Sequence, residues 1–199
     1  ISNILVAYIL TVILNVLIIE SVKRKNLEVN KHITDLSMRD DLTGLLNRRA
    51  IEQVFSRLEG EFRKEGTEYA VVMMDIDKFK SINDLFGHNL GDSVLKNMAA
   101  FISKSIRSED YAFRFGGDEF LLILPHVNRE TAHEICERIE IGLQNIQGYA
   151  FPLTVSKGYA LRSESTSSTE VLNLADQLMY EAKKSKSSDE SLIGTSPVK

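Results

Sequence analysis

Residues 111–124 read YAFRFGGDEFLLIL, in which two aromatic and aliphatic runs flank the pair Gly116 and Gly117. Runs of this composition are typical of β-strands, and a glycine pair between them predicts a tight turn because glycine adopts positive φ at little cost. Two acids, Asp118 and Glu119, follow the glycines directly. The stretch therefore predicts a β-hairpin that carries two carboxylates at its turn.

A second stretch predicts a strand that is buried on both faces. Residues 69–76 are almost continuously apolar and end around the carboxylate of Asp75, with Asp77 just beyond. If this strand lies beside the hairpin, the acids of both segments form one cluster. Such a cluster suits Mg²⁺, which takes oxygen ligands and is commonly shared with substrate phosphates. The alternative is a set of solvated surface acids, but the strand and turn positions favour a metal site for a nucleoside triphosphate.

The remaining pattern mixes amphipathic helices with short strands. Helices are expected at residues 45–62, 91–106, 129–143 and 168–184, and a further strand at residues 153–161. Asp40 or Asp41 is a candidate N-cap for the first of these helices. This order of elements indicates an α+β layer fold with a largely antiparallel sheet.

Composition narrows the class of protein. The chain has 199 residues, of which 43% are hydrophobic and 26% are charged, as expected for one packed domain with an accessory segment. The net charge of -4 argues against a nucleic-acid partner, which usually requires a basic surface. Cys136 is the single cysteine, so an intrachain disulfide and a cysteine metal cage are excluded.

The N-terminal residues predict a membrane anchor. Residues 1–19 contain no charged side chain and have about the length of a transmembrane helix, with a buried core helix as the alternative. Lys23, Arg24 and Lys25 follow, and basic flanking residues tend to stay on the cytoplasmic side. We therefore expect the rest of the chain to lie in the cytoplasm. The chain begins without Met, which suggests that an upstream portion is missing.

The residues on either side of the core are expected to form a stalk and a tail. Residues 20–38 predict a helical signalling stalk, because apolar residues there follow the spacing of a coiled-coil seam; an ordinary amphipathic helix is the alternative. The seam positions are Val22, Asn26, Val29, Ile33 and Leu36. Residues 187–199 are polar and predict a flexible tail.

Four motifs in order resemble one family, the GGDEF diguanylate cyclases. Residues 114–120 read RFGGDEF, which matches the family signature residue for residue. The other three are DLTGLLNRR at residues 41–49, DIDKFKSIND at 75–84 and GHNLGD at 87–92. We assign residues 39–186 to the GGDEF domain. The resemblance implies a palm-like fold similar to nucleotidyl cyclases and polymerases, with a ferredoxin-like core and a five-stranded, mostly antiparallel sheet surrounded by helices.

The resemblance also implies roles for individual residues. It implies that Mg²⁺, which Mn²⁺ can replace, binds at Asp75, the carbonyl of Ile76, Asp118 and Glu119. Asp118 occupies the position usually assigned to the proton acceptor, and Glu119 is the second catalytic acid. The implied substrate contacts are Asn83, Asp92 and His88 for guanine, and Lys78, Phe79, Lys80 and Lys183 for the phosphates. Gly116 and Gly117, which lack a Cβ, let the backbone approach the ligand closely.

The implied activity is the condensation of two GTP molecules into cyclic di-GMP with release of two pyrophosphates. Each domain of this family binds one GTP, so the reaction implies a homodimer. Arg107 and Asp110 match the family's Arg-x-x-Asp site, where cyclic di-GMP acts as product and inhibitor; a charged turn is the alternative. With the expected helix at residues 1–19, the resemblance implies a membrane-anchored member in the bacterial inner (cytoplasmic) membrane.

Two alternatives remain open on the sequence. One is a catalytically silent receptor that binds GTP or cyclic di-GMP, and the other is a cyclase of altered base specificity. The chain also departs from the family after Lys183, where it reads KSKSS in place of a Gly-Arg-Asn-like run. Lys186 can supply a point charge there but not the two-pronged hydrogen bonding of arginine.

Overall fold

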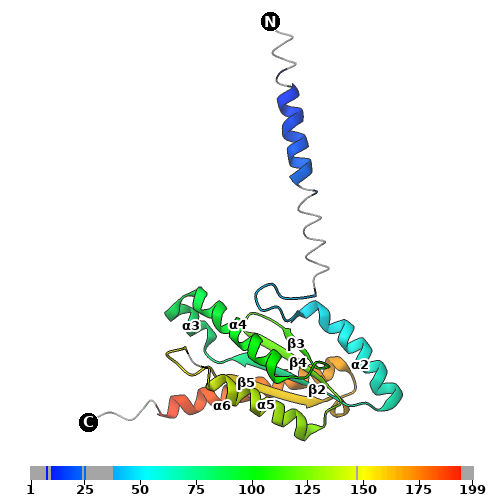
Figure 1. Ribbon diagram of the computed structural model, residues 1–199, viewed down its shortest axis with the longest axis vertical. Coiled ribbons are helices and arrows are strands. Elements are labelled where there is room, and N and C mark those ends of the chain that lie inside the picture. Colours follow the sequence, from blue (N-terminus) through cyan, green and yellow to red (C-terminus); the bar gives the residue numbers. More distant parts are fainter. Residues whose placement is uncertain (1–7, 9, 24, 26–37, 147, 194–199) are drawn as a thin grey trace, which may run out of the picture. The chain divides into compact units, whose positions relative to one another are not determined.

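The protein is described by a computed structural model that covers residues 8, 10–23, 25, 38–146 and 148–193 (Figure 1). The chain divides into two compact units, residues 1–38 and residues 39–199.

The N-terminal unit contains a helical run over residues 10–23. Within the described residues, every helix is too short or too polar to cross a membrane. The predicted inner-membrane location is therefore corrected. The predicted transmembrane helix at residues 1–19 falls partly on residues 1–7 and 9, which lie outside the described part of the chain. The predicted stalk stays a prediction, because residues 26–37 lie outside the described part of the chain.

The C-terminal unit alternates helices and strands along the chain. In order these are β1 (Leu46–Asn47), η1 (Arg48–Ala50), α2 (Ile51–Glu65), β2 (Tyr69–Ile76), α3 (Phe79–Phe86), α4 (His88–Ser105), β3 (Tyr111–Arg114), β4 (Glu119–Pro125), α5 (Arg129–Gln144), β5 (Val155–Leu161), η2 (Arg162–Glu164) and α6 (Ser168–Ile193).

The strands form one five-stranded sheet in the order β1-β3-β4-β2-β5. The pairs β3–β4, β4–β2 and β2–β5 are antiparallel, while β1 pairs with β3 in parallel. All eight residues of β2 are buried, as its continuous apolar run predicted. The expected α+β fold with a five-stranded, mostly antiparallel sheet is confirmed.

One face of the sheet is covered by α4 and α5. Ala70, Val72 and Met74, which alternate along β2, belong to the main cluster of buried residues. Val94 of α4 and Ile135 of α5 belong to the same cluster. Because side chains alternate between the faces of a strand, the intervening β2 residues point to the opposite face.

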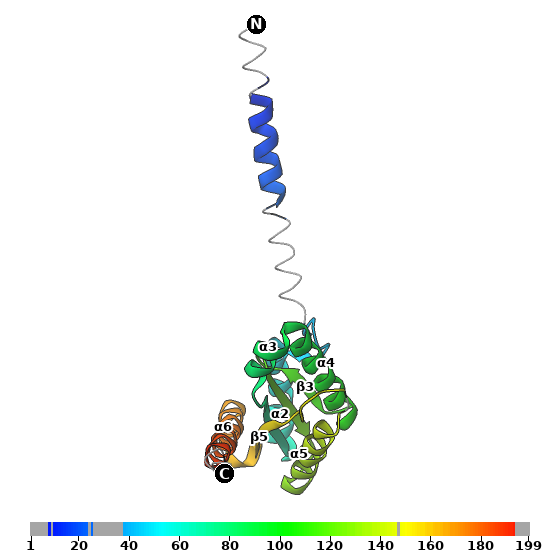
Figure 2. The same ribbon diagram turned by 90° about the vertical axis from the view of Figure 1, so that its left-hand side faces the viewer.

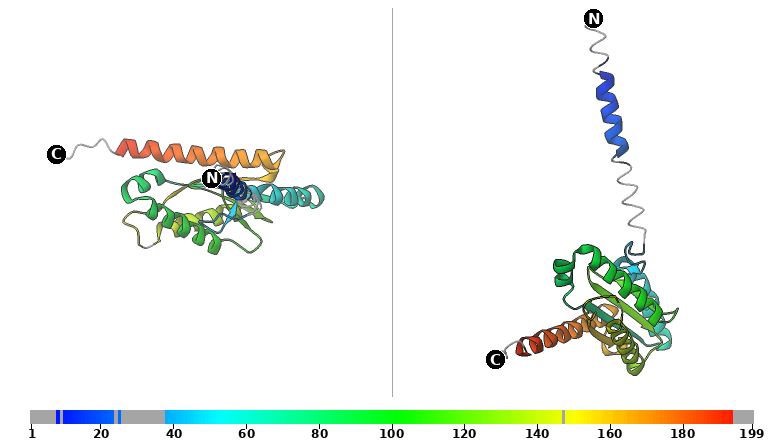
Figure 3. Two further views of the ribbon diagram at one scale, coloured as in Figure 1. Left: turned by 90° about the horizontal axis from the view of Figure 1, so that it is seen from above. Right: turned by 60° about the vertical axis from the view of Figure 1, so that its left-hand side comes forward.

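The opposite face is covered by α2 and α6 (Figures 2 and 3). The ring of Tyr69 lies against Phe55 of α2, with 6.2 Å between ring centroids. Helix α6 packs directly on β5 at Gly158, where a Cβ would come within 2.1 Å of the backbone nitrogen of Met179. Glycine at this position therefore allows the helix to approach the sheet.

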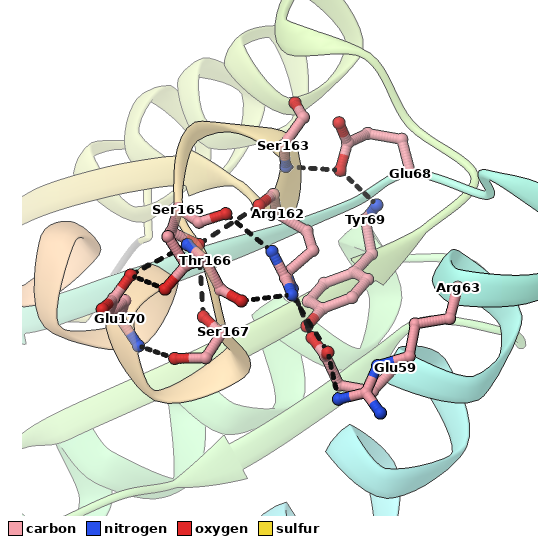
Figure 4. A network of polar contacts seen from close by, with 10 residues as sticks. All are labelled: Glu59, Arg63, Glu68, Tyr69, Arg162, Ser163, Ser165, Thr166, Ser167 and Glu170. Carbon is pink, nitrogen blue, oxygen red and sulfur yellow. Dashed lines mark hydrogen bonds and ion pairs between the residues drawn. The ribbon is translucent and has the colours of Figure 1, made fainter.

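A buried ion pair joins α2 to the segment after β5 (Figure 4). Arg162 donates to both carboxylate oxygens of Glu59 and to the carbonyls of Ser165 and Thr166. Tyr69 donates to Glu59 Oε1 at 2.7 Å. Glu59 and Arg162 are 8% and 5% exposed, so this network is shielded from water.

Four local features differ from the predictions. The first core helix begins at Ile51, not residue 45, because Leu46 and Asn47 pair with β3. Asp40 closes a turn by accepting from the backbone N–H and the hydroxyl of Thr43, so it does not cap that helix. Helix α3 was not predicted, and α6 continues to Ile193.

Candidate active site

The end of β2 and the β3–β4 hairpin meet at one edge of the sheet. Asp75 on β2 is directly opposite Glu119 on β4 and Ser156 on β5. The backbone N–H of Ile76 donates to the carbonyl of Asp118 at 3.3 Å. The expectation that the two acidic segments are neighbours is confirmed by this pairing.

The hairpin turn depends on its glycines in a different way from the predicted one. The N–H groups of Phe115 and Gly116 both donate to the carbonyl of Glu119, at 2.9 and 3.3 Å. Neither Gly116 nor Gly117 has a positive φ, so that part of the prediction is wrong. A Cβ at Gly116 would lie 2.5 Å from Glu119 Oε2. A side chain at residue 116 would therefore require the Glu119 carboxylate to move.

Arg114 fixes the turn from outside. Its Nε and Nη2 donate to the carbonyl of Gly117 at 3.1 and 2.8 Å, and its Nη1 donates to Asp40 Oδ2 at 3.2 Å. Burial of Asp40 opposes its ionisation, but hydrogen bonds from Thr43 and the charge of Arg114 hold its pKa below the usual value. Sequence reasoning quoted Arg114 within the signature but gave it no role, because its partner lies far away in the sequence.

The acids at this edge disfavour one another's ionisation. Burial raises the pKa of Asp75, which is 5% exposed; a hydrogen bond from Lys183 opposes that rise, and the charges of Asp118 and Asp77 add to it. The pKa of Glu119 is also raised, first by burial and then by the charges of Asp75 and Asp118. The site therefore favours a cation.

Two lysines of α6 reach these acids. Lys183 Nζ donates to Asp75 Oδ1 at 2.6 Å. Lys186 Nζ donates to Asp77 Oδ2 at 3.1 Å and to the carbonyl of Val155 at 2.6 Å. Burial opposes the charge of Lys183, but the hydrogen bond to Asp75 and the negative charges of Asp75, Asp118 and Asp77 together raise the pKa of Lys183. The ammonium group of Lys183 therefore stays charged beside Asp75.

The donor set fits a magnesium ion that is shared with a ligand. In the part of the chain that the structure describes, three or more acidic, histidine or cysteine side chains do not converge on one point as a ready metal cage. Mg²⁺ commonly takes one or two carboxylates and completes its shell with water and phosphate oxygens. Asp75, Asp118 and Glu119 offer oxygen donors of this kind.

The predicted guanine-binding residues lie on α3 and α4. Asn83 is half-buried, and its side chain packs against α4 where a Cβ at Gly91 would be 1.9 Å from Asn83 Oδ1. His88 and Asp92 are exposed near the start of α4. Gly91 was missed by sequence reasoning, because the need for glycine arises from this contact between helices.

The predicted phosphate-binding residues lie where α3 begins. Lys78 precedes the helix with a left-handed φ of 58°, and Phe79 packs against the buried cluster. Lys80 is exposed. The left-handed conformation of Lys78 turns the chain after β2, so that α3 begins two residues beyond Asp77.

Arg107 and Asp110 form a turn between α4 and β3. Asp110 Oδ2 accepts from the backbone N–H of Arg107 at 2.8 Å, and the Arg107 side chain is exposed. Asp110 is 8% exposed, and burial raises its pKa despite the hydrogen bond from Arg107. Its Oδ1 is buried without a hydrogen-bond partner among the described residues.

These observations define a palm-like α+β domain with an acidic edge formed by its central strand and a signature hairpin. The sequence profile described as "Diguanylate cyclase, GGDEF domain" matches residues 37–189. The chain therefore belongs to the GGDEF diguanylate cyclase family.

Relatives and solved structures agree with this assignment. The chain is 36% identical over 162 residues to diguanylate cyclase DosC of Escherichia coli, covering 79% of this chain and 35% of DosC. It thus spans about a third of that relative. The GGDEF domain of DgcB from Caulobacter crescentus, solved in complex with c-di-GMP, superposes with a TM-score of 0.72 at 30% identity, covering 75% of this chain and 91% of DgcB's. Diguanylate cyclase SiaD of Pseudomonas aeruginosa, solved with its activator SiaC, gives a TM-score of 0.67 at 31% identity, covering 84% and 66%.

Proposed function

We propose that the chain condenses two GTP molecules into cyclic di-GMP and two pyrophosphates. The observation that carries this proposal is the pairing of Asp75 with Glu119, which brings the acids of the two motifs together beside Lys183. The names of the relatives, which are diguanylate cyclases, support it.

The proposed metal-binding groups are Asp75, the carbonyl of Ile76, Asp118 and Glu119, with Mg²⁺ or Mn²⁺ as the ion. When bound, the ion supplies positive charge that stabilises the phosphoryl oxygens. The raised pKa values of Asp75 and Glu119 support this proposal, because each reports a surplus of negative charge or burial that a cation would offset.

The chain's own residues bind and orient the nucleotide. Asn83 and Asp92 offer hydrogen-bond acceptors and donors to the edge of guanine, and His88 lines the same side. Lys78, Phe79 and Lys80 meet the phosphates through backbone and charge, with Lys183 opposite. Gly117, where a Cβ would meet nothing within 4 Å, leaves room for the ribose and phosphates beside the turn, and Gly116 lets the backbone approach the ligand.

The proposed chemistry is a phosphoryl transfer between two bound nucleotides. The 3′-oxygen of one GTP forms a bond to the α-phosphorus of the other, and the bond to pyrophosphate breaks. Asp118 accepts the proton of the attacking hydroxyl, and Lys183 neutralises charge on the phosphates. Because each domain binds one GTP, a homodimer aligns the two reactants. In the second step the 3′-oxygen of the other nucleotide forms a bond to the remaining α-phosphorus, the second pyrophosphate leaves, and the ring closes.

The proposal includes inhibition by the product at Arg107 and Asp110. Arginine can donate two hydrogen bonds to guanine O6 and N7, and a carboxylate accepts from its amino and imino groups. The exposure of the Arg107 side chain and the hydrogen bond that places Asp110 beside Arg107 support this assignment.

The test is the rate of pyrophosphate release from GTP by the full chain with Mg²⁺. Asp118→Asn should lower that rate by about 10² to 10⁴, the usual contribution of a proton acceptor. Glu130→Gln, which removes a carboxylate from the first turn of α5, is the matched control and should leave it unchanged. A native chain that binds GTP without releasing pyrophosphate would replace the proposal with a receptor.

A further inference from the structure

A cavity of about 900 Å³ lies between α3, the segment that leads into β5, and α6. Its lining includes Ser81 and Leu85 of α3, whereas Asn83 of the same helix packs against α4. Residues two positions apart lie on nearly opposite sides of an α-helix. The side of the cavity formed by Ser81 and Leu85 is therefore on the other side of α3 from the proposed guanine contacts. Lys78 and Lys183 of the lining are proposed phosphate contacts, whereas the apolar part of the lining has no role in the proposed function.

One end of the cavity is apolar and aromatic. Leu85 is 76% exposed and Phe86 is 49% exposed, which is unusual for large apolar side chains on neighbouring positions. The ring of Phe86 stacks on Phe151, with 5.3 Å between centroids, and Phe151 stacks on Tyr149 at 5.5 Å. The hydroxyl of Tyr149 accepts from Asn97 of α4 at 2.6 Å. This hydrogen bond holds the stacked rings of Phe86, Phe151 and Tyr149 against α4.

The other end of the cavity is polar and carries ammonium groups. Lys183 and Lys186 line it from α6, one helical turn apart. Each ammonium group has three donors, and Lys183 donates to Asp75 while Lys186 donates to Asp77 and Val155. The lining also includes Lys78 and the carboxylates of Asp77 and Glu140, and Glu140 Oε1 lies 3.8 Å from Lys186 Nζ. Three ammonium groups therefore face two carboxylates, and a bound carboxylate, sulfonate or phosphate would meet this excess of positive charge.

We propose that this cavity binds a small planar aromatic anion. The aromatic ring lies against Leu85, Phe86 and Phe151, and the anionic group meets Lys183 and Lys186. The volume falls within the 300–1,000 Å³ typical of small-molecule sites, and an apolar wall with a few converging polar groups is their usual lining. Because Lys183 lines this cavity and is also a proposed phosphate contact, the bound anion competes with the phosphates of GTP; this consequence alone rests on the proposed function.

The test is a fluorescence titration of the full chain with anilinonaphthalene sulfonate, an aromatic anion with a planar naphthalene ring. We expect saturable binding of one probe per chain. Leu85→Asp should raise the Kd about tenfold or more, because it places a carboxylate in the apolar end. Ile141→Asp is the matched control: Ile141 is 57% exposed on α5, outside this lining, and its replacement should leave the Kd unchanged.

Equal weakening by Leu85→Asp and Ile141→Asp, or no weakening by either, would overturn the proposal. Thermal unfolding checks that each variant folds, and if Leu85→Asp does not, Lys186→Gln decides instead, with an expected rise in Kd of several-fold. Inorganic triphosphate should displace the probe from the native chain. Failure to displace it would disprove the claim that Lys183 contacts both the bound anion and the phosphates. These readouts use no GTP turnover, so their failure is distinguishable from failure of the cyclase proposal.

Discussion

Arg114 and Asp40 are 74 positions apart in the chain, and their side chains meet with 3.2 Å between Arg114 Nη1 and Asp40 Oδ2. The same guanidinium donates to the carbonyl of Gly117. One side chain therefore connects the signature turn to the first residues of the domain. Because Arg39 and Asn47 are hydrogen-bonded within that same segment, the turn is tied to a structured base.

Loss of the hydrogen bonds from the Arg114 guanidinium to Gly117 and Asp40 should lower activity more than stability. Arg114→Lys keeps a positive charge but cannot bond Gly117 and Asp40 together. We expect the rate of pyrophosphate release to fall about tenfold, as expected when the turn bearing the proposed proton acceptor is misplaced. Equal activity of Arg114→Lys and the native chain would contradict the positioning role.

Asp40→Asn should cost about 1 kcal/mol in the free energy of unfolding, compared with near zero for Glu61→Gln, which removes an exposed pair with Arg57.

Gly116→Ala should perturb the Glu119 carboxylate without unfolding the domain. The new Cβ would lie 2.5 Å from Glu119 Oε2, so the carboxylate must move. We expect a loss of activity that higher Mg²⁺ partly restores, with little change in Tm. Gly60→Ala is the matched control: its Cβ meets open space within α2, and the change should stabilise the chain by about 0.5–1 kcal/mol. Activity assays and thermal unfolding of both variants decide the point.

Substitution in the buried pair of Glu59 and Arg162 should lower the free energy of unfolding by a large amount. Glu59→Gln leaves the guanidinium of Arg162 without its counter-charge in a place that is 5% exposed. Breaking such a pair typically costs about 3–5 kcal/mol. Urea unfolding at neutral pH measures the loss. A cost below that of the exposed Glu61→Gln change would show that the network contributes little.

The same pair predicts a dependence of stability on pH. The hydrogen bond from Arg162 is the main reason that the pKa of Glu59 is lowered; burial opposes it, and Tyr69 adds to it. A carboxyl whose pKa is lowered on folding stabilises the native state above its unfolded pKa of about 4.3, and this stabilisation is lost as the pH falls through the folded pKa. The difference in unfolding free energy between the native chain and Glu59→Gln should thus be constant near neutrality and shrink below about pH 4. A difference that grows in acid would contradict the sign.

Local patterns in the sequence were sufficient for the central strand and the hairpin. The apolar run of β2 and the glycine pair between two strand-like runs each depend on neighbours in sequence. Helix α3 was missed because it follows a left-handed residue, Lys78, that a propensity pattern does not reveal. The two-residue strand β1 exists through its pairing with β3, and the roles of Arg114 and Gly91 arise from contacts between distant segments. Such contacts become visible with the fold.

Mass-spectrometric identification of the product is the most direct test of the proposed activity. The full chain is incubated with GTP and Mg²⁺ beside Asp118→Asn and Glu130→Gln, all shown to unfold with similar Tm. The account predicts cyclic di-GMP from the native chain and from Glu130→Gln, and none from Asp118→Asn. Unconverted GTP with the native chain, or the same product from Asp118→Asn, would contradict it.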